Sequence, residues 1–275
     1  MRNVWLVLCA VLLSSPCMAW NGRGHAAIAA LAQANLSPAT LAQVEVLLRD
    51  DLDRYEQPSG RKSLAAVASW PDEIRDVAVK TDPAAYRGWH VRSNQVCGQK
   101  LGSCKDGACV DQLIIRYAAV LRDHQQSPRA RNEALKWVVH LVGDLHMPLH
   151  SGINRNGGSA KVVLEGFDLK PDATFHTVWD GQLLDAALKG WKSGARLESV
   201  ERLAADAPTQ WMIEARDVAL HDSYEPLAGF VCSDVRLPEP FVLDAAYQQR
   251  SVPVVRQQVE RAGLRLAQLL NEALQ

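Results

Sequence analysis

The sequence has 275 residues, of which 48% are hydrophobic and 22% are charged, and its formal net charge at neutral pH is −1. A chain of this length and composition buries a substantial core in one domain, or at most two, which excludes a disordered or low-complexity protein. A near-neutral charge also excludes a broad basic face, so local features would have to hold any nucleic acid.

The first 19 residues are predicted to be a leader that is not part of the fold. Arg2 is their only charge, an apolar run covers residues 4–13, and small residues precede the end at Ala19. This order is typical of a secretory signal peptide, and ten apolar residues are fewer than the roughly 20 that a membrane span needs. A lipoprotein cut before Cys17 is the alternative, which Pro16 disfavours. We expect a signal peptide at 1–19, a single domain at 20–275, no membrane span, and a periplasmic or secreted location.

Four cysteines follow the leader: Cys97, Cys104, Cys109 and Cys232. An even number of cysteines in an exported chain indicates two disulfides. Four cysteines allow three pairings, and free buried thiols are a further alternative.

Helical patterns dominate the rest of the chain. Ser37 followed by proline predicts an N-cap and a first helical turn, and apolar residues recur at helical spacing in several later stretches. Helices are expected at residues 25–36, 38–48, 63–70, 109–123, 131–146, 176–188, 209–220 and 254–274. Residues 92–107 and 151–174 are expected to be irregular, with one possible short strand at 161–164. The sequence therefore predicts an all-α single domain with at most a short β-hairpin.

Two His-x-x-x-Asp pairs carry the strongest chemical signal. His140 and Asp144 stand four residues apart, as do His176 and Asp180, and His150 follows a proline shortly after the first pair. On a helix this spacing puts both side chains on one face, where imidazole and carboxylate together can bind zinc. A single such pair is more often a surface hydrogen bond, but the helix around His140 is so apolar that a buried charge there needs a partner.

Five separated motifs then occur in a fixed order: W-N-G-R-G-H from Trp20, W-P-D-E-I-R from Trp70, W-H from Trp89, H-L-V-G-D-L-H-M-P-L-H from His140, and H-T-V-W-D from His176. Together they resemble the zinc-dependent single-strand nucleases of fungi, plants and bacteria, of the nuclease P-one and S-one type. The resemblance runs from Trp20 to about Asp180 and continues more weakly in the C-terminal helices. It implies the helical fold shared by these nucleases and the zinc-dependent phospholipases C.

The resemblance also implies three zinc ions in one cleft and a division of the ligands among them. The first ion would take Asp72, His90, His140 and Asp144. The second would share Asp144 and add His25 together with the N-terminal amine and carbonyl oxygen of Trp20. The third would take His150, His176 and Asp180. Arg75 stands where the family has an arginine that steadies the transition state, so Asp72 and Arg75 are the expected catalytic residues.

The implied activity is hydrolysis of single-stranded DNA and RNA to 5′-nucleotides, with 3′-nucleotidase activity, through attack by a hydroxide that two zinc ions share. We expect a monomer whose partners are these nucleic acids and nucleotides. A zinc-dependent phospholipase C is the alternative, although its first histidine lies further from the N-terminus and its last ligand is usually Glu. A zinc-buffering protein without catalysis is a third possibility.

Some positions depart from the family pattern. The aromatic residue that usually follows the first-zinc histidine is Val91 here, and Asn94 is the candidate substrate-binding residue in place of a nearby acid or amide. The usual Gly-Gly-Asn is Gly157-Gly158-Ser159, and an Asn two before His176 is replaced by Thr174. By proximity, and because related plant enzymes look similar, we predict the disulfides Cys104–Cys109 and Cys97–Cys232.

Overall fold

The computed structural model describes residues 20–156, 158–166, 173–198, 201–232, 236–237 and 239–275. The predicted signal peptide and Gly157 lie outside the described residues. The helices and short helical turns are α1 Gly22–Gln33, α2 Pro38–Leu47, α3 Leu64–Val67, α4 Trp70–Ala78, η1 Lys105–Gly107, α5 Val110–Arg122, α6 Pro128–Leu145, α7 Pro148–Ser151, α8 Phe175–Thr177, η2 Val178–Leu183, α9 Leu184–Leu188, α10 Ala207–Val218, η3 Ala219–Tyr224 and α11 Ala245–Ala273.

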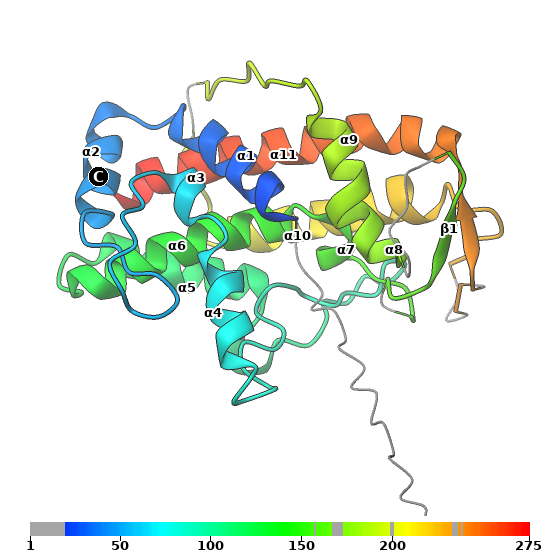
Figure 1. Ribbon diagram of the computed structural model, residues 1–275, viewed down its shortest axis with the longest axis horizontal. Helices are drawn as coiled ribbons and strands as arrows, with labels where there is room; N and C mark the ends of the chain where they lie inside the picture. The colour runs from blue at the N-terminus through cyan, green and yellow to red at the C-terminus, as the bar shows by residue number, and fades with distance from the viewer. Residues whose placement is uncertain (1–19, 157, 167–172, 199–200, 233–235, 238) are drawn as a thin grey trace, which may run out of the picture.

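Helix α6 is the centre of the fold (Figure 1). It contacts α5, α11, α1, α4, α2 and α10, while α1 lies along α11 on one side of it. Every residue from Ala134 to His150 is buried, so α6 and the turn after it have neighbours on all sides. The helix begins three residues before the predicted start because Ser127 accepts a hydrogen bond from the Ala130 amide and Pro128 occupies the first turn. The buried part of α6, from Ala134 onward, therefore positions its polar side chains rigidly.

The predicted helix at 63–70 is in fact two elements. Ser63 caps α3 through the Ala66 amide, and a new helix, α4, begins at Trp70 with Pro71 in its first turn. The predicted range 63–70 therefore covers α3 and only the first residue of α4. This difference matters because α4 carries both Asp72 and Arg75.

The last helix is longer than predicted and continues through a proline. Asp244 caps α11 by accepting from the Tyr247 amide (2.7 Å), well before Pro253. Proline removes one helical hydrogen bond, which would have reached the carbonyl of Gln249. Pro253 and Gln249 are both exposed, so water can satisfy that carbonyl and the helix continues.

The all-α class is confirmed, and so is the possible short strand at 161–164, although its partner strand is parallel and the two form no hairpin. Strand β1 (Val162–Leu164) pairs in parallel with β2 (Phe241–Leu243), which comes from just before α11. Parallel neighbours cannot be joined by a tight turn, so this pair fastens two distant parts of the chain instead.

The disulfide pairing is as predicted. Cys97 bonds to Cys232 across 135 residues of sequence, and Cys104 bonds to Cys109. In the chain-entropy model, a bridge that closes so long a loop stabilises the folded protein by roughly 4–5 kcal/mol, because it lowers the entropy of the unfolded chain. None of the described helices has the length and apolar character required to cross a membrane.

Candidate metal centre

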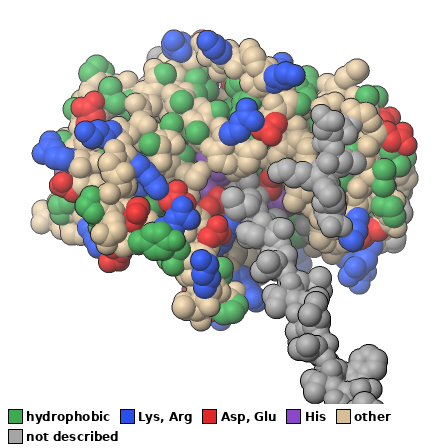
Figure 2. All heavy atoms as spheres, in the orientation of Figure 1, with side chains coloured by type: hydrophobic (Ala, Val, Ile, Leu, Met, Phe, Trp, Pro, Cys, Tyr) green, Lys and Arg blue, Asp and Glu red, His purple; other side chains and the backbone are tan. Residues whose placement is uncertain are grey.

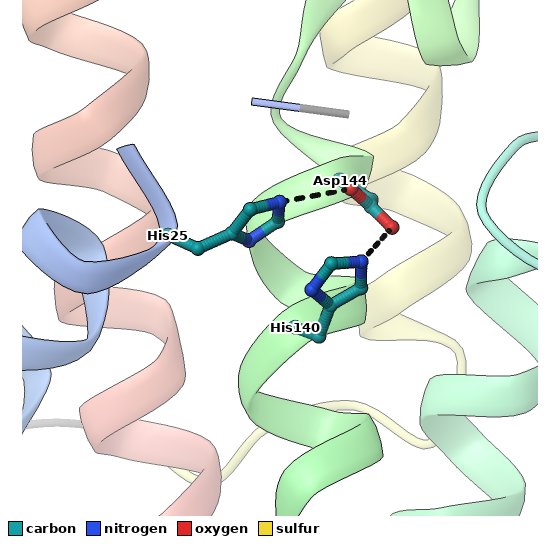
Figure 3. Close-up of side chains that lie close together, drawn as sticks. All are labelled: His25, His140 and Asp144. Atoms are coloured by element: carbon teal, nitrogen blue, oxygen red, sulfur yellow. Dashed lines mark ion pairs between the residues drawn. The ribbon is translucent and has the colours of Figure 1, made fainter. Parts of the chain in front are cut away.

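Side chains from four segments meet around Asp144, and Figure 3 shows two of them, His25 and His140. Its Oδ2 lies 2.8 Å from Nδ1 of His90 and 3.1 Å from Nε2 of His140, and its Oδ1 lies 3.4 Å from Nε2 of His25. His140 precedes Asp144 by one turn of α6, while His25 comes from α1 and His90 from the segment after α4. Oδ1 of Asp72, on α4, lies 3.8 Å from His140 Nε2 and 3.9 Å from His90 Nδ1. We call these five residues the Asp144 group.

A second set of ligands lies beside the first. Nε2 of His150 is 3.1 Å from Nε2 of His176, which in turn is 3.0 Å from Oδ2 of Asp180. Asp180 lies in η2, a π-helical turn, an irregularity that occurs often at functional sites. We call His150, His176 and Asp180 the Asp180 group. His150 Nδ1 is 3.8 Å from Asp144 Oδ1, so the two groups are adjacent.

Two glycines leave room for the imidazole rings. A Cβ at Gly143 would come within 2.8 Å of His25 Nδ1, so only glycine lets α1 bring this ring against α6. Gly158 has a φ of +73°, and a Cβ there would lie 3.2 Å from the Cβ of His176. The glycine of H-L-V-G-D is therefore part of the site, although the motif by itself indicates no role for it.

Backbone carbonyls fix the orientation of two rings. His140 Nδ1 donates to the carbonyl of Ala68 (2.7 Å), and His150 Nδ1 donates to the carbonyl of His90 (3.0 Å). In the neutral ring, each contact puts the proton on Nδ1 and leaves Nε2 with a lone pair directed at the cluster. These carbonyls carry no side-chain signature, so sequence reasoning could not find them.

The carboxylates of the two groups sit in opposite electrostatic environments. Burial would raise the pKa of Asp144, but His140, His25 and His90 outweigh it and hold that pKa well below its usual range. Burial likewise opposes the effect of Asp144 and Asp72 on His140, yet the two carboxylates raise the pKa of this histidine to about 9. At Asp180 burial prevails over the attraction of His176 and raises the pKa to about 6.

The residues fit a set of bound metal ions. Among the described residues, neither ring nitrogen of His25 has a hydrogen-bond partner, nor does His90 Nε2 or Asp144 Oδ1, although all are buried. Such unpartnered atoms are costly. The Nε2 atoms of His150 and His176 also face each other at 3.1 Å, close to the roughly 3.3 Å that two nitrogens bound to one tetrahedral zinc would show. Three groups of ligand atoms meet in this way: His25, His140 and Asp144; Asp72, His90 and His140; His150, His176 and Asp180.

The centre opens to one face of the molecule. Figure 2 shows histidine side chains at the bottom of a hollow in that face, with acidic and basic side chains around it. A helical domain that holds clustered imidazole and carboxylate ligands in a hollow is the architecture of a metal-dependent hydrolase.

Comparison with known proteins identifies the family within the class of metal-dependent hydrolases. A family model described as S1/P1 Nuclease matches residues 20–275, so the chain belongs to the S1/P1 nuclease family. The chain is 25% identical to Endonuclease 3 of Arabidopsis thaliana, over 98% of this chain and 94% of that protein. It is 27% identical to Nuclease S1 of Aspergillus oryzae, over 92% and 91% of the two chains, and 27% identical to Nuclease P1 of Penicillium citrinum, over 58% and 57%. The family is zinc-dependent, and the chain is a hydrolase of the endonuclease type.

The remaining predicted residues lie close to the two groups. Arg75 is nearly buried, and its Nη1 lies 2.9 Å from Asp72 Oδ1 while its Nη2 lies 3.3 Å from Asp76 Oδ1. The Trp20 side chain is fully buried. The next amide, that of Asn21, donates to the carbonyl of Asp180 (3.1 Å), which holds the Trp20 end of the domain beside the Asp180 group.

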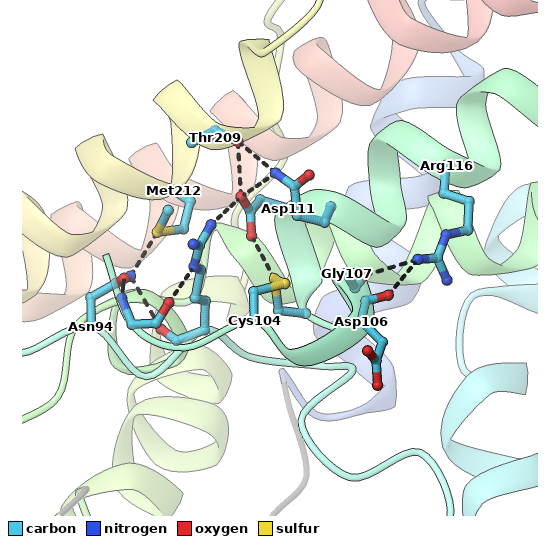
Figure 4. The surroundings of a disulfide bond; sticks show 12 residues. Asn94, Cys104, Asp106, Gly107, Asp111, Arg116, Thr209 and Met212 are labelled. Atoms are coloured by element: carbon cyan, nitrogen blue, oxygen red, sulfur yellow. Dashed lines mark hydrogen bonds and ion pairs between the residues drawn. A yellow bond between two sulfur atoms is a disulfide. The ribbon is translucent and has the colours of Figure 1, made fainter. Parts of the chain in front are cut away.

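The structure argues against a substrate-binding role for Asn94 (Figure 4). Its side chain is fully buried, and its amide nitrogen donates to the carbonyl of Ser151 (2.6 Å) and contacts the sulfur of Met212. Its oxygen accepts from the amide of Gly102 (2.7 Å). The amide thus fastens the loop near the Cys104–Cys109 bridge to α7 and α10, and it has no face left for a ligand. Thr174 has a structural role too, since it caps α8.

Proposed function

We propose that this chain is an exported phosphodiesterase that uses three zinc ions to hydrolyse single-stranded DNA and RNA to 5′-nucleotides, with 3′-nucleotidase activity. The observation that carries the proposal is the position of Asp144, whose two oxygens lie within 2.8–3.4 Å of three histidines from three separate segments. One carboxylate placed in this way can bridge two cations. The match to the S1/P1 nuclease family supports the choice of substrate.

The ligands divide among three ions as follows. Asp72, His90, His140 and Asp144 hold the first. His25 and Asp144 hold the second, with the α-amine and carbonyl oxygen of Trp20. His150, His176 and Asp180 hold the third. The three clusters of ligand atoms support this division, with His140 close to both clusters in the Asp144 group.

The surrounding residues prepare the site for phosphoryl chemistry. Bound zinc lowers the pKa of a coordinated water toward neutrality and so supplies a nucleophile for attack on phosphorus. Asp144 stays ionised because its pKa is held low, so its carboxylate would have a full negative charge with which to hold metal ions. The ion pair between Asp72 and Arg75 holds the guanidinium at the edge of the group, where its charge can stabilise the phosphoryl oxygens in the transition state.

Export completes the proposal. Residues 1–19 act as a signal peptide, and cleavage after Ala19 frees the α-amine of Trp20. The family match that begins at residue 20, the burial of Trp20 and the two disulfides support this assignment. The enzyme then works in the periplasm or outside the cell as a monomer.

The test is metal analysis of the mature protein, together with hydrolysis assays on single-stranded DNA, RNA, a 3′-nucleotide and phosphatidylcholine. Three zinc ions per chain and cleavage of the first three substrates are expected. One ion or none in active protein would refute the trinuclear site. Preferred hydrolysis of phosphatidylcholine would favour a phospholipase C, and bound zinc without hydrolysis would indicate a buffering protein. Because Val91 replaces the usual stacking aromatic, we expect weak discrimination between bases.

A further inference from the structure

A buried lysine lies beneath the helix that carries Asp72. Lys136 stands one turn before His140 on α6 and is only 1% exposed. Its Nζ lies 3.8 Å from the centre of the Trp70 ring, and Trp70 begins α4, two residues before Asp72. Lys136 is therefore adjacent to the metal centre without being a ligand.

The other contacts of Lys136 hold its charge in place. Nζ donates to Asp51 Oδ1 (2.8 Å) and to the carbonyl of Leu52 (3.1 Å), which leaves its third hydrogen for the face of the Trp70 ring. Burying an ammonium and a carboxylate together costs desolvation that packed apolar side chains avoid. An apolar side chain would fill this space at a lower cost. The charge of Lys136 is therefore better explained by its directed contacts with Asp51, Leu52 and the Trp70 ring.

The start of α4 depends on such contacts because its own cap is weak. Ser69 occupies the N-cap position but makes no side-chain capping hydrogen bond within the described part of the chain. Helix α6 instead holds this segment at two points one turn apart: His140 donates to the carbonyl of Ala68, and Lys136 supports the ring of Trp70. Asp72 is the next carboxylate along the segment, with its Oδ1 3.8 Å from His140 Nε2.

We propose that Lys136 is a positioning residue for Asp72, setting the height of α4 on α6 so that this carboxylate reaches the ion it shares with His90 and His140. The inference rests on the proposed zinc site. Residues that orient metal ligands typically change metal affinity by about 10- to 100-fold when they are removed.

The experiment measures zinc retained per chain against buffered free zinc, with stability of the metal-free protein measured in urea. The main variant combines Lys136→Met with Asp51→Asn, because removing the lysine alone would leave a buried carboxylate unpaired. The proposal predicts that one of the ions is released at about 10- to 100-fold higher free zinc than in the wild type. The single variant Asp51→Asn, which keeps the cation over Trp70, should retain that ion.

Asn132→Leu is the matched control. Asn132 lies one turn before Lys136 and donates to the same Asp51 (3.2 Å) and to the carbonyl of Leu47, and neither of these contacts involves Trp70. It should lower stability and leave zinc affinity within about threefold of the wild type. Equal zinc affinity in the double variant and the wild type, or equal losses in the double variant and Asn132→Leu, would overturn the positioning role. A wild type that binds no zinc would instead refute the proposed function.

Discussion

The ligands around Asp144 come from four separate segments of the chain, whereas those around Asp180 come from residues 150–180 alone. In the first group a single carboxylate contacts three histidines, and in the second Asp180 forms an ion pair with His176. Both groups are buried. The difference shows how ligand number sets charge: three imidazoles keep Asp144 ionised, while burial dominates at Asp180 and raises its pKa.

Removing the central carboxylate should produce the largest effect. We expect Asp144→Ala to release two ions and to lower kcat/KM by at least roughly 10³-fold, because the interactions of two cations are lost at once. Asp180→Ala should release one ion and retain more activity. Zinc analysis and steady-state kinetics of both variants check this order. Similar losses of metal in the two variants would mean that Asp144 does not bridge two ions.

Extending the N-terminus should have the next largest effect. If Trp20 is a ligand through its α-amine, a protein beginning Met-Trp20 offers a peptide amide there, which is a poor zinc ligand. We expect it to fold, to bind the second ion weakly, and to lose about 10²-fold in rate because the site is incomplete. Trp20→Ala at the mature terminus should be milder, since alanine keeps the amine and the carbonyl. A Met-extended protein with normal zinc content and rate would show that only side chains bind the metals.

A methyl group at Gly143 tests the packing of His25. Gly143→Ala favours the helix intrinsically by about 1 kcal/mol, but its Cβ would lie 2.8 Å from His25 Nδ1 and must displace that ring. We expect roughly tenfold weaker binding of the second ion, measured by chelator competition. Gly181→Ala, beside Asp180, is the matched control because a Cβ at that position would have no atom of the described residues within 4 Å. Unchanged zinc affinity in Gly143→Ala would mean that the His25 ring does not lie against Gly143 when metal is bound.

The smallest expected effect is a difference between the two groups in the number of protons released when zinc binds. In the metal-free protein the pKa of His140 is raised to about 9, so at neutral pH its proton must leave before zinc can bind. The affinity of the Asp144 group for zinc should therefore fall about tenfold for each unit by which the pH is lowered below about 9. Asp180, with a pKa of about 6, is ionised above that value, and burial lowers the pKa of His150 well below its usual range, so both side chains are deprotonated near pH 7.

Calorimetry of zinc binding in buffers of different ionisation enthalpy measures these protons. Near pH 7 we expect about one proton released for ions in the Asp144 group and fewer for the ion in the Asp180 group. Equal proton release from the two groups would contradict the contrast between their carboxylates.

Much of the site could be predicted from the sequence because its strongest signals are local. His140 and Asp144, and His176 and Asp180, stand one helical turn apart, and this spacing fixes their common face wherever the helix lies. Proline and serine marked the start of α2 correctly for the same reason. The structure gives Asn94 a different role from the predicted one because burial is not a local property: its side chain packs against residues that are distant in sequence.

Local patterns in the chain were enough to predict the helical class, the order of the ligand motifs and the one-turn pairs, since each depends on neighbours within a few residues. Other features became visible only in the folded chain: Gly143 makes room for His25, the carbonyls of Ala68 and His90 orient two rings, and Lys136 supports Trp70 beneath Asp72. Helical periodicity is set by backbone geometry, which repeats every few residues. Contacts between segments far apart in the chain depend instead on how the buried faces of α1, α4 and α6 pack, which no local spacing specifies.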